Sequence, residues 1–175
     1  MIFTPGLALV VFVALLMIQR LSELVISTRN ASLVKARGAR EYGAGHYPWL
    51  VLLHVFYPVA LVSEVLLGAR PGPLWPLWLL LYLGAQALRF SAMRALGDRW
   101  NTRILVIPGA PLVKSGPYRW LRHPNYLAVV IEVAALPLAV GAVVTAAAAS
   151  LLNLALLAVR IRCEEEALGI RAASR

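Results

Sequence analysis

Charged residues are scarce in this chain of 175 residues, at 14%, whereas hydrophobic residues make up 61%. Soluble domains carry about 25% charged residues and about 45 to 50% apolar ones. The composition therefore argues against an ordinary soluble domain, and it excludes intrinsic disorder as well. A bilayer is the expected solvent, because the chain is long enough for several spans of about 20 apolar residues each.

Cysteine and acidic residues are also few. Cys163 is the one cysteine, so no intramolecular disulfide can form, and no His/Cys cluster predicts a metal site. The 8 acidic residues face 17 Lys and Arg, which gives a net charge of +9. Such an excess favours nucleic acid, an anionic membrane leaflet or an anionic cofactor as partner, and the positions of the basic residues discriminate among these.

Five apolar segments predict an all-α integral membrane protein with about five transmembrane helices, folded as one domain over residues 1–175. The expected spans cover about 3–26, 47–67, 74–93, 125–141 and 143–160. The first segment has neither the basic start nor the cleavage site of a signal peptide, so we expect it to remain as a span. Pro137 and Gly141 are expected to turn the last apolar stretch into a helical hairpin.

Lys and Arg accumulate in the two long connections and in the C-terminal tail, and Arg70 is the exception in a loop on the other side. Basic residues mark cytoplasmic loops, so we expect a multi-pass protein of the cell membrane with its N-terminus outside and its C-terminus cytoplasmic. Topology then explains the net charge, so membrane lipids are expected partners and nucleic acid is not. The tryptophans expected at the two interfaces are Trp75 and Trp78 on one side and Trp49, Trp100 and Trp120 on the other.

The connection before the fourth span carries the sequence Arg122-His-Pro-Asn-Tyr126. Pro124 restricts His123 to an extended or turn conformation and suits the first turn of the next helix. His123 and the following backbone N–H groups would then gather at the positive end of that helix, where a carboxylate or another anion can bind. A basic turn at the membrane interface, with no ligand, is the alternative.

The tail reads Arg160-Ile-Arg-Cys-Glu-Glu-Glu-Ala-Leu168. On a helix, Arg160 shares a face with Glu164, and Asn153 lies two turns below Arg160. Arg162 shares a different face with Glu166. An Arg–Glu pair near the membrane end can present a cation and a carboxylate to one bound molecule, and a solvated charged helix end is the alternative.

Together these motifs resemble a known family. Gly116-Pro-Tyr-Arg, Arg122-His-Pro-Asn-Tyr126 and Arg160 with Glu164-Glu165-x-x-Leu168 resemble the isoprenylcysteine carboxyl methyltransferase family of integral membrane enzymes. The segments Gln19-Arg-Leu-Ser-Glu23, Glu41-Tyr-Gly-Ala-Gly-His-Tyr-Pro48 and Arg99-Trp-Asn-Thr102 are similar to a bacterial branch. That branch is associated with O-methylation of long-chain alkylpyrones and alkylresorcinols made by type III polyketide synthases.

The resemblance implies a cytoplasmic cofactor pocket, built from the loop before the fourth helix and the C-terminal tail, that binds S-adenosyl-L-methionine. It also implies a lipid-like small-molecule acceptor and a functional link to a polyketide synthase. The residues that match the cofactor pocket are Pro111, Leu112, Val113, Tyr118, His123, Pro124, Asn125, Tyr126 and Glu164. Arg160 matches an arginine placed toward the substrate. No Gly-x-Gly-x-x-Gly follows a strand, so a soluble Rossmann site is not expected.

The acidity of the acceptor hydroxyl decides whether the reaction needs a catalytic base. An enol of a hydroxypyrone is largely ionised near neutral pH, so Arg160, with Arg122 and Asn101 next, can hold the oxyanion. A resorcinol hydroxyl needs a base, for which His123 and Glu132 are the candidates. An ionisable group inside a span suggests a functional site, and an internal partner for a Tyr or Arg is the alternative role of Glu132.

His46 lies in a glycine-containing loop that can fold over the pocket, and it is expected to contact substrate. His54 and Glu64 are instead assigned to packing or to the interface. Three other functions stay open. They are a carboxyl methyltransferase acting on a prenylated cysteine, an NADPH-dependent membrane lipid reductase and a non-catalytic membrane subunit. Such reductases carry a similar turn, but here Leu127-Ala-Val-Val-Ile follows it.

Overall fold

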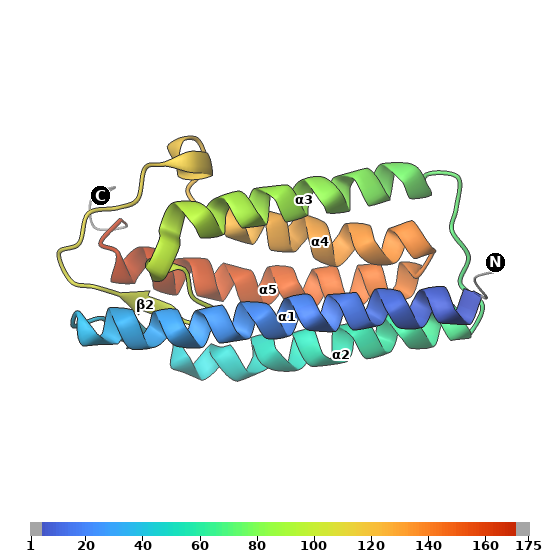
Figure 1. Ribbon diagram of the computed structural model, residues 1–175, viewed down its shortest axis with the longest axis horizontal. Coiled ribbons are helices and arrows are strands. Elements are labelled where there is room, and N and C mark those ends of the chain that lie inside the picture. The colour runs from blue at the N-terminus through green and yellow to red at the C-terminus, as the bar shows by residue number, and fades with distance from the viewer. Residues whose placement is uncertain (1–4, 171–175) are drawn as a thin grey trace.

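The computed structural model describes residues 5–170, except for the side chains of residues 5–10 and 12. Five long helices lie side by side along one axis (Figure 1). They are α1 (Pro5–Ala36), α2 (Tyr47–Leu66), α3 (Trp75–Leu96), α4 (Pro124–Val140) and α5 (Val143–Ala167). Each overlaps one of the five apolar segments, so five helices are confirmed, while residues 3 and 4 of the first segment lie outside the described part. Helix α1 continues ten residues beyond the expected end at 26, and α5 continues seven residues beyond the expected end at 160.

Two stretches within the described residues are long and apolar enough to cross a membrane, Ala44–Leu66 and Val143–Ala167. Helix α4 is apolar but shorter, at 17 residues. Helices α1 and α3 span 32 and 22 residues and carry polar side chains toward the bundle. Five membrane crossings therefore stay a prediction.

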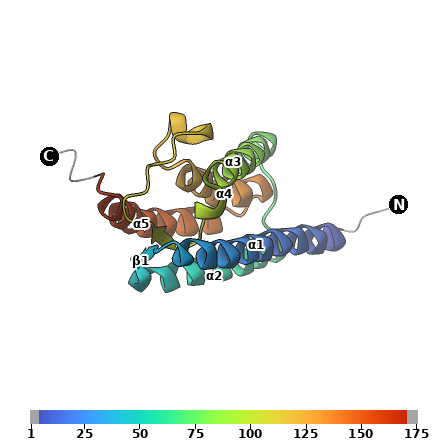
Figure 2. The ribbon, with the colours of Figure 1, turned by 60° about the vertical axis from the view of Figure 1, so that its left-hand side comes forward.

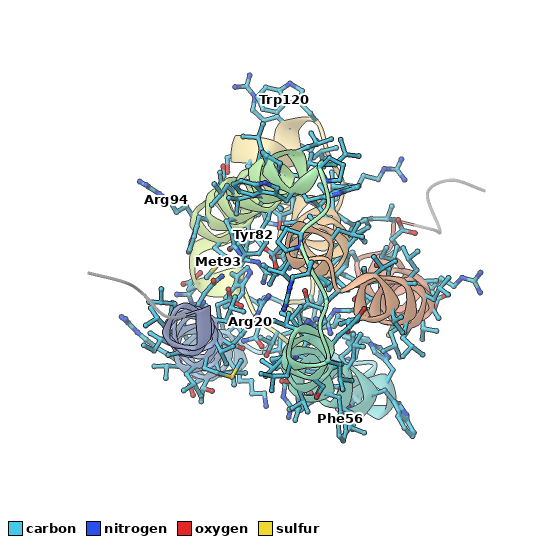
Figure 3. The ribbon with its side chains drawn as sticks, turned by 90° about the vertical axis from the view of Figure 1, so that its right-hand side faces the viewer. Arg20, Phe56, Tyr82, Met93, Arg94 and Trp120 are labelled. Atoms are coloured by element: carbon cyan, nitrogen blue, oxygen red, sulfur yellow. The ribbon has the colours of Figure 1, made fainter. Side chains whose placement is uncertain are left out.

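Helix α1 is polar on its inner face and apolar on its outer face. Glu23, Ser27 and Asn30 are buried, whereas Leu21 and Val25 are 61% and 70% exposed. A water-soluble amphipathic helix has the opposite pattern. Viewed along the bundle, Arg20 of α1 also points inward, while Phe56 and Trp120 lie at the periphery (Figure 3). This arrangement suits a helix whose outer face contacts lipid.

One end of the bundle collects both long connections and the end of α5 (Figures 1 and 2). There β1 (Arg40–Tyr42) pairs antiparallel with β2 (Ile104–Val106), and Glu41 lies opposite Leu105. Three short 3-10 helices complete this end, η1 (Ala44–His46), η2 (Gly97–Arg99) and η3 (Gly116–Arg119). The small sheet corrects the all-α prediction, because strands of three residues are too short to leave an alternating pattern in the sequence.

The opposite end is closed by the turn between α4 and α5. Gly141 has a φ of 82°, a left-handed conformation that favours glycine, and a Cβ there would overlap the carbonyl oxygen of Arg70. The carboxylate of Glu64 at the end of α2 accepts bonds from the backbone N–H groups of Val144 (3.0 Å) and Thr145 (2.7 Å). The expected hairpin is thus confirmed, and Glu64 ties α2 to the start of α5.

Small and apolar residues form the core between α2, α3, α4 and α5, where Leu61, Tyr82 and Leu136 pack together. The expected tryptophan belt stays a prediction for Trp49 and Trp120, which are 62% and 78% exposed. It is wrong for Trp100, which is 3% exposed. The Trp100 indole N–H donates to the Asn125 side-chain oxygen over 3.5 Å, so this ring packs under the loop instead of facing the interface.

Candidate active site

A cavity of about 280 Å³ lies at the end of the bundle that holds the long connections, and we call it the loop cavity. Its walls come from the connection between α3 and α4, the first turn of α4 and the last turns of α5. Eight of the nine residues expected to hold the cofactor line it: Pro111, Leu112, Val113, Tyr118, His123, Asn125, Tyr126 and Glu164. Pro124, the ninth, is buried and opens α4 instead.

The loop cavity is strongly cationic. Glu164 is the one carboxylate among its described lining residues, which include five basic side chains, namely Arg99, Arg103, Lys114, Arg122 and Arg160. Arg103 is partly neutralised, because it pairs with Glu41 at 2.6 Å, and this hydrogen bond raises the pKa of Arg103. Burial and then the charge of Glu164 raise the pKa of Tyr118, so its phenol stays protonated.

His123 and Glu164 both line this cavity and lie close to each other. The His123 ring stacks on Tyr126 with 5.4 Å between centroids, and its Nε2 lies 3.3 Å from a carboxylate oxygen of Glu165. Its Nδ1 lies 3.8 Å from Glu164. The turn before α4 and the end of α5 are therefore joined, as the pairing of the two sequence motifs predicts. Glu165 was named only as part of the tail motif and was not assigned to the site, yet it contacts His123.

A second cavity of about 350 Å³ lies within the bundle, and we call it the helix cavity. It is lined mainly by apolar side chains of α1 and α2, together with parts of α4 and α5. Leu21 and Leu24 of α1, with Val51 and Val55 of α2, are all more than 40% exposed at its edge. The cavity therefore reaches the outer apolar surface between α1 and α2.

Arg20 of α1 and Arg89 of α3 line the helix cavity, and both are neutralised by the same two carboxylates. Arg20 lies 2.9 Å from Glu23 and 3.0 Å from Glu132. Arg89 lies 3.2 Å from Glu23, and its Nε donates to Glu132 over 2.7 Å. Glu132 is 2% exposed and lines neither of the two cavities. This geometry favours the role of internal arginine partner for Glu132 over that of a catalytic base.

Five residues line both cavities and form their shared wall: Trp100, Asn101, Asn125, Tyr126 and Arg160. Arg160 Nε donates to the Tyr126 hydroxyl over 2.9 Å, and its Nη2 donates to the Thr102 carbonyl over 2.7 Å. The Tyr126 hydroxyl in turn donates to Glu164. Within residues 5–170, Nη1 of Arg160 has no acceptor and its guanidinium has no carboxylate partner.

Two further expectations from the sequence have different outcomes. Asn101 lies in the shared wall and is fixed by Ser27, whose carbonyl accepts from the Asn101 amide over 2.8 Å. His46 lines neither cavity. It packs beside Gly43 and Cys163, where a Cβ on Gly43 would overlap the His46 ring, so the loop folds against α5 instead of over the pocket.

The isoprenylcysteine carboxyl methyltransferase family model matches residues 78–170, which is more than half of the chain. The chain belongs to this family. The match begins within α3 and includes both faces of the loop cavity, the turn at His123 and the end of α5. Membership in the isoprenylcysteine carboxyl methyltransferase family indicates a membrane methyltransferase, and enzymes of this family use S-adenosylmethionine.

Two bacterial proteins resemble the chain over most of its length. The uncharacterized protein YpbQ of Bacillus subtilis is 42% identical over 157 residues, covering 89% of this chain and 94% of that protein. An uncharacterized protein of Haemophilus influenzae is 30% identical over 151 residues, covering 85% and 88% of the two chains. No solved structure matches the chain.

Proposed function

We propose that the protein is an S-adenosylmethionine-dependent O-methyltransferase that acts on the ring hydroxyl of a membrane-dissolved, long-chain alkylpyrone or alkylresorcinol. The observation that carries this proposal is the wall shared by the two cavities. A cationic cavity and an apolar cavity meet at Arg160 and Tyr126. Such an arrangement brings a water-soluble cofactor and a lipid-soluble acceptor to one point from opposite sides.

The chemistry of the loop cavity suits the cofactor. Lys114 and Arg122 can bind the methionyl carboxylate, and the Glu164 carboxylate can accept hydrogen bonds from the ribose hydroxyls or the amine. Leu112 and Val113 supply apolar surface for the adenine. When bound, S-adenosylmethionine supplies a methyl group already activated by its sulfonium, so correct positioning of the acceptor carries most of the rate.

The chemistry of the helix cavity suits an amphiphile. Its opening between the apolar faces of α1 and α2 can take an alkyl tail directly from lipid, and its inner end reaches the shared wall. Burying each methylene of such a tail stabilises the complex by about 0.8 kcal/mol. The ring would thus lie against Arg160 while the tail extends outward.

Arg160 is assigned to the acceptor oxygen. Its Nη1 is free to bind an oxyanion, since Nε and Nη2 are already used by Tyr126 and Thr102. A neutral ring hydroxyl can lose its proton to the Tyr126 oxygen as the Tyr126 proton passes to Glu164, along the existing hydrogen bond. Asn101 in the same wall can hold the ring from its other edge.

This function sets the loop cavity on the cytoplasmic side, where the cofactor is available, and links the enzyme to a type III polyketide synthase that makes the acceptor. A carboxyl methyltransferase for prenylated cysteine would use the same cofactor cavity. The Tyr126–Glu164 contact does not favour it, because a substrate carboxylate is already ionised and would not need to pass a proton along this contact.

The test is titration calorimetry on detergent-purified protein together with turnover assays. The wild type should bind S-adenosylhomocysteine and methylate a long-chain hydroxypyrone or alkylresorcinol. Arg160→Lys keeps the charge but loses the planar fork, so turnover should fall about tenfold or more while S-adenosylhomocysteine affinity changes little. Arg162→Lys is the matched control, because Arg162 is exposed and lines neither cavity. Binding of NADPH without S-adenosylhomocysteine would refute the proposal.

A further inference from the structure

Two polar residues outside the shared wall, Asn153 and His54, line the helix cavity. The side chain of Asn153 on α5 is 1% exposed, and neither its amide nitrogen nor its amide oxygen has a hydrogen-bond partner among the described residues. A buried amide without partners is costly, and native proteins rarely keep one without a reason. Asn153 lies in the wall of the helix cavity, so a ligand there can supply the missing partner.

His54 on α2 lines the same cavity and has a defined tautomer. Its Nδ1 lies 2.8 Å from the backbone carbonyl of Leu50. A carbonyl only accepts, so Nδ1 must carry the proton, and Nε2 of the neutral ring presents a lone pair. Because Nδ1 faces the backbone of its own helix, Nε2 faces away from that helix. No described residue donates to it.

The register of the two helices relates the positions of these residues. Helices α2 and α5 run antiparallel, and Glu64 contacts Thr145 at one end. At the other end, Tyr47 and Arg160 both contact Thr102, at 3.2 and 2.7 Å. His54 follows Tyr47 by seven residues and Asn153 precedes Arg160 by seven, so the equal helical rise places their backbones at a similar level along the bundle.

We propose that Asn153 and His54 form a subsite for a second ring hydroxyl of the acceptor, so that the enzyme prefers a dihydroxy ring to a hydroxypyrone. This inference rests on the proposed function and names its substrate class. A hydroxyl both donates and accepts, so it can donate to His54 Nε2 and accept from the Asn153 amide. A ring carbonyl accepts only and leaves the His54 lone pair unmatched.

The dimensions agree with a ring of this kind. Seven residues of helix separate the backbones of Asn153 and Arg160 by about 10 Å along the axis. This leaves room between them for a six-membered ring that carries two oxygens on alternate carbons, with a hydrogen bond of about 3 Å at each end. A tail at the remaining alternate carbon points sideways from the line between the oxygens, toward the opening between α1 and α2.

The test compares an alkylresorcinol with the matching meta-alkylphenol, which has the same tail and lacks one hydroxyl. The wild type should show a kcat/KM about tenfold to a hundredfold higher for the resorcinol. Asn153→Leu should lower kcat/KM for the resorcinol about tenfold and leave the phenol almost unchanged. His54→Phe should do the same to the resorcinol and affect a hydroxypyrone less than Asn153→Leu does.

Leu154→Met is the control, because Leu154 is the neighbour of Asn153, is 50% exposed and lines neither cavity. It should keep the wild-type preference. If Asn153→Leu lowers kcat/KM equally for both substrates, the amide serves packing alone and the subsite is refuted.

Binding measured in lipid nanodiscs without turnover separates this inference from the proposed function. Selective binding of the resorcinol that is lost in Asn153→Leu supports the subsite even if no methylation occurs, in which case only the proposed function fails. Equal binding of the resorcinol and the phenol by the wild type refutes the subsite, whatever the turnover.

Discussion

The loop cavity and the helix cavity share a wall but differ in their charge balance. In the loop cavity, five basic side chains face one carboxylate, and the excess is tolerated because this end of the bundle is polar. In the helix cavity, Arg20 and Arg89 are balanced by Glu23 and Glu132, since an unpaired ion surrounded by apolar helices is costly. Arg160 departs from this rule, and it lies where the two cavities meet. An unpaired charge therefore indicates a functional role more strongly in the helix cavity than in the loop cavity.

The largest expected effect is all-or-none and concerns the sides on which the two cavities lie. In a Cys163→Ser background, Ser32→Cys and Ser115→Cys should resist an impermeant maleimide applied to intact cells and should react after lysis. Both positions are exposed at the end that holds the loop cavity. Gly72→Cys at the other end should react from outside. Labelling of Ser32→Cys or Ser115→Cys from outside would reverse the orientation.

The next largest effect concerns the charge balance of the helix cavity. Glu132→Ala leaves the Arg89 guanidinium without its main partner, and removing one member of a buried ion pair costs about 3 to 5 kcal/mol. We expect a large loss of thermal stability in detergent. The double variant Glu132→Leu with Arg89→Met removes both charges and should recover most of it.

An exposed ion pair is the control for this measurement. Arg37 and Asp98 lie 2.5 Å apart with side chains 53% and 34% exposed, and Arg37→Ala should change stability by about 1 kcal/mol or less. If Glu132→Ala instead keeps full stability and loses turnover alone, Glu132 acts as a catalytic group and the balance inferred for this cavity is wrong.

The smallest of these effects concerns the loop cavity. Glu164→Ala and His123→Ala each remove hydrogen bonds to charged groups worth about 1.5 to 3 kcal/mol, so S-adenosylhomocysteine should bind about tenfold more weakly or worse. Calorimetry measures this directly, with Glu166→Ala as the control because Glu166 lines neither cavity. Unchanged affinity in folded Glu164→Ala and His123→Ala proteins would remove both residues from the site.

Helical periodicity predicted much of this arrangement. The five helices follow from apolar runs, and the shared face of Arg160 and Glu164 follows from their spacing of four residues. The meeting of His123 with the end of α5 was expected from the two motifs together. These features depend on residues that are close together in the chain or on the family resemblance, and both are available from the sequence alone.

Contacts between distant helices could not be read in this way. The sequence set Asn153 below Arg160, but nothing in it indicates that the Asn153 amide lacks partners. His54 was assigned to packing. Its tautomer follows from a contact with Leu50 within α2, but the cavity that His54 lines is completed by other helices. Trp100 was expected at the interface because its burial under the loop depends on Asn125, 25 positions away.

The buried ionic cluster also imposes an order on biosynthesis. Within this cluster α1 supplies Arg20 and Glu23, three residues apart, whose charges balance each other. Helix α3 then brings Arg89 with no matching acid of its own, and the compensating Glu132 arrives only with α4, after a connection of more than twenty residues. A nascent chain that stops after α3 would hold one surplus positive charge within its bundle. We therefore expect a truncated chain that ends after α3 to be unstable, and we expect α4 to be the segment that completes the fold.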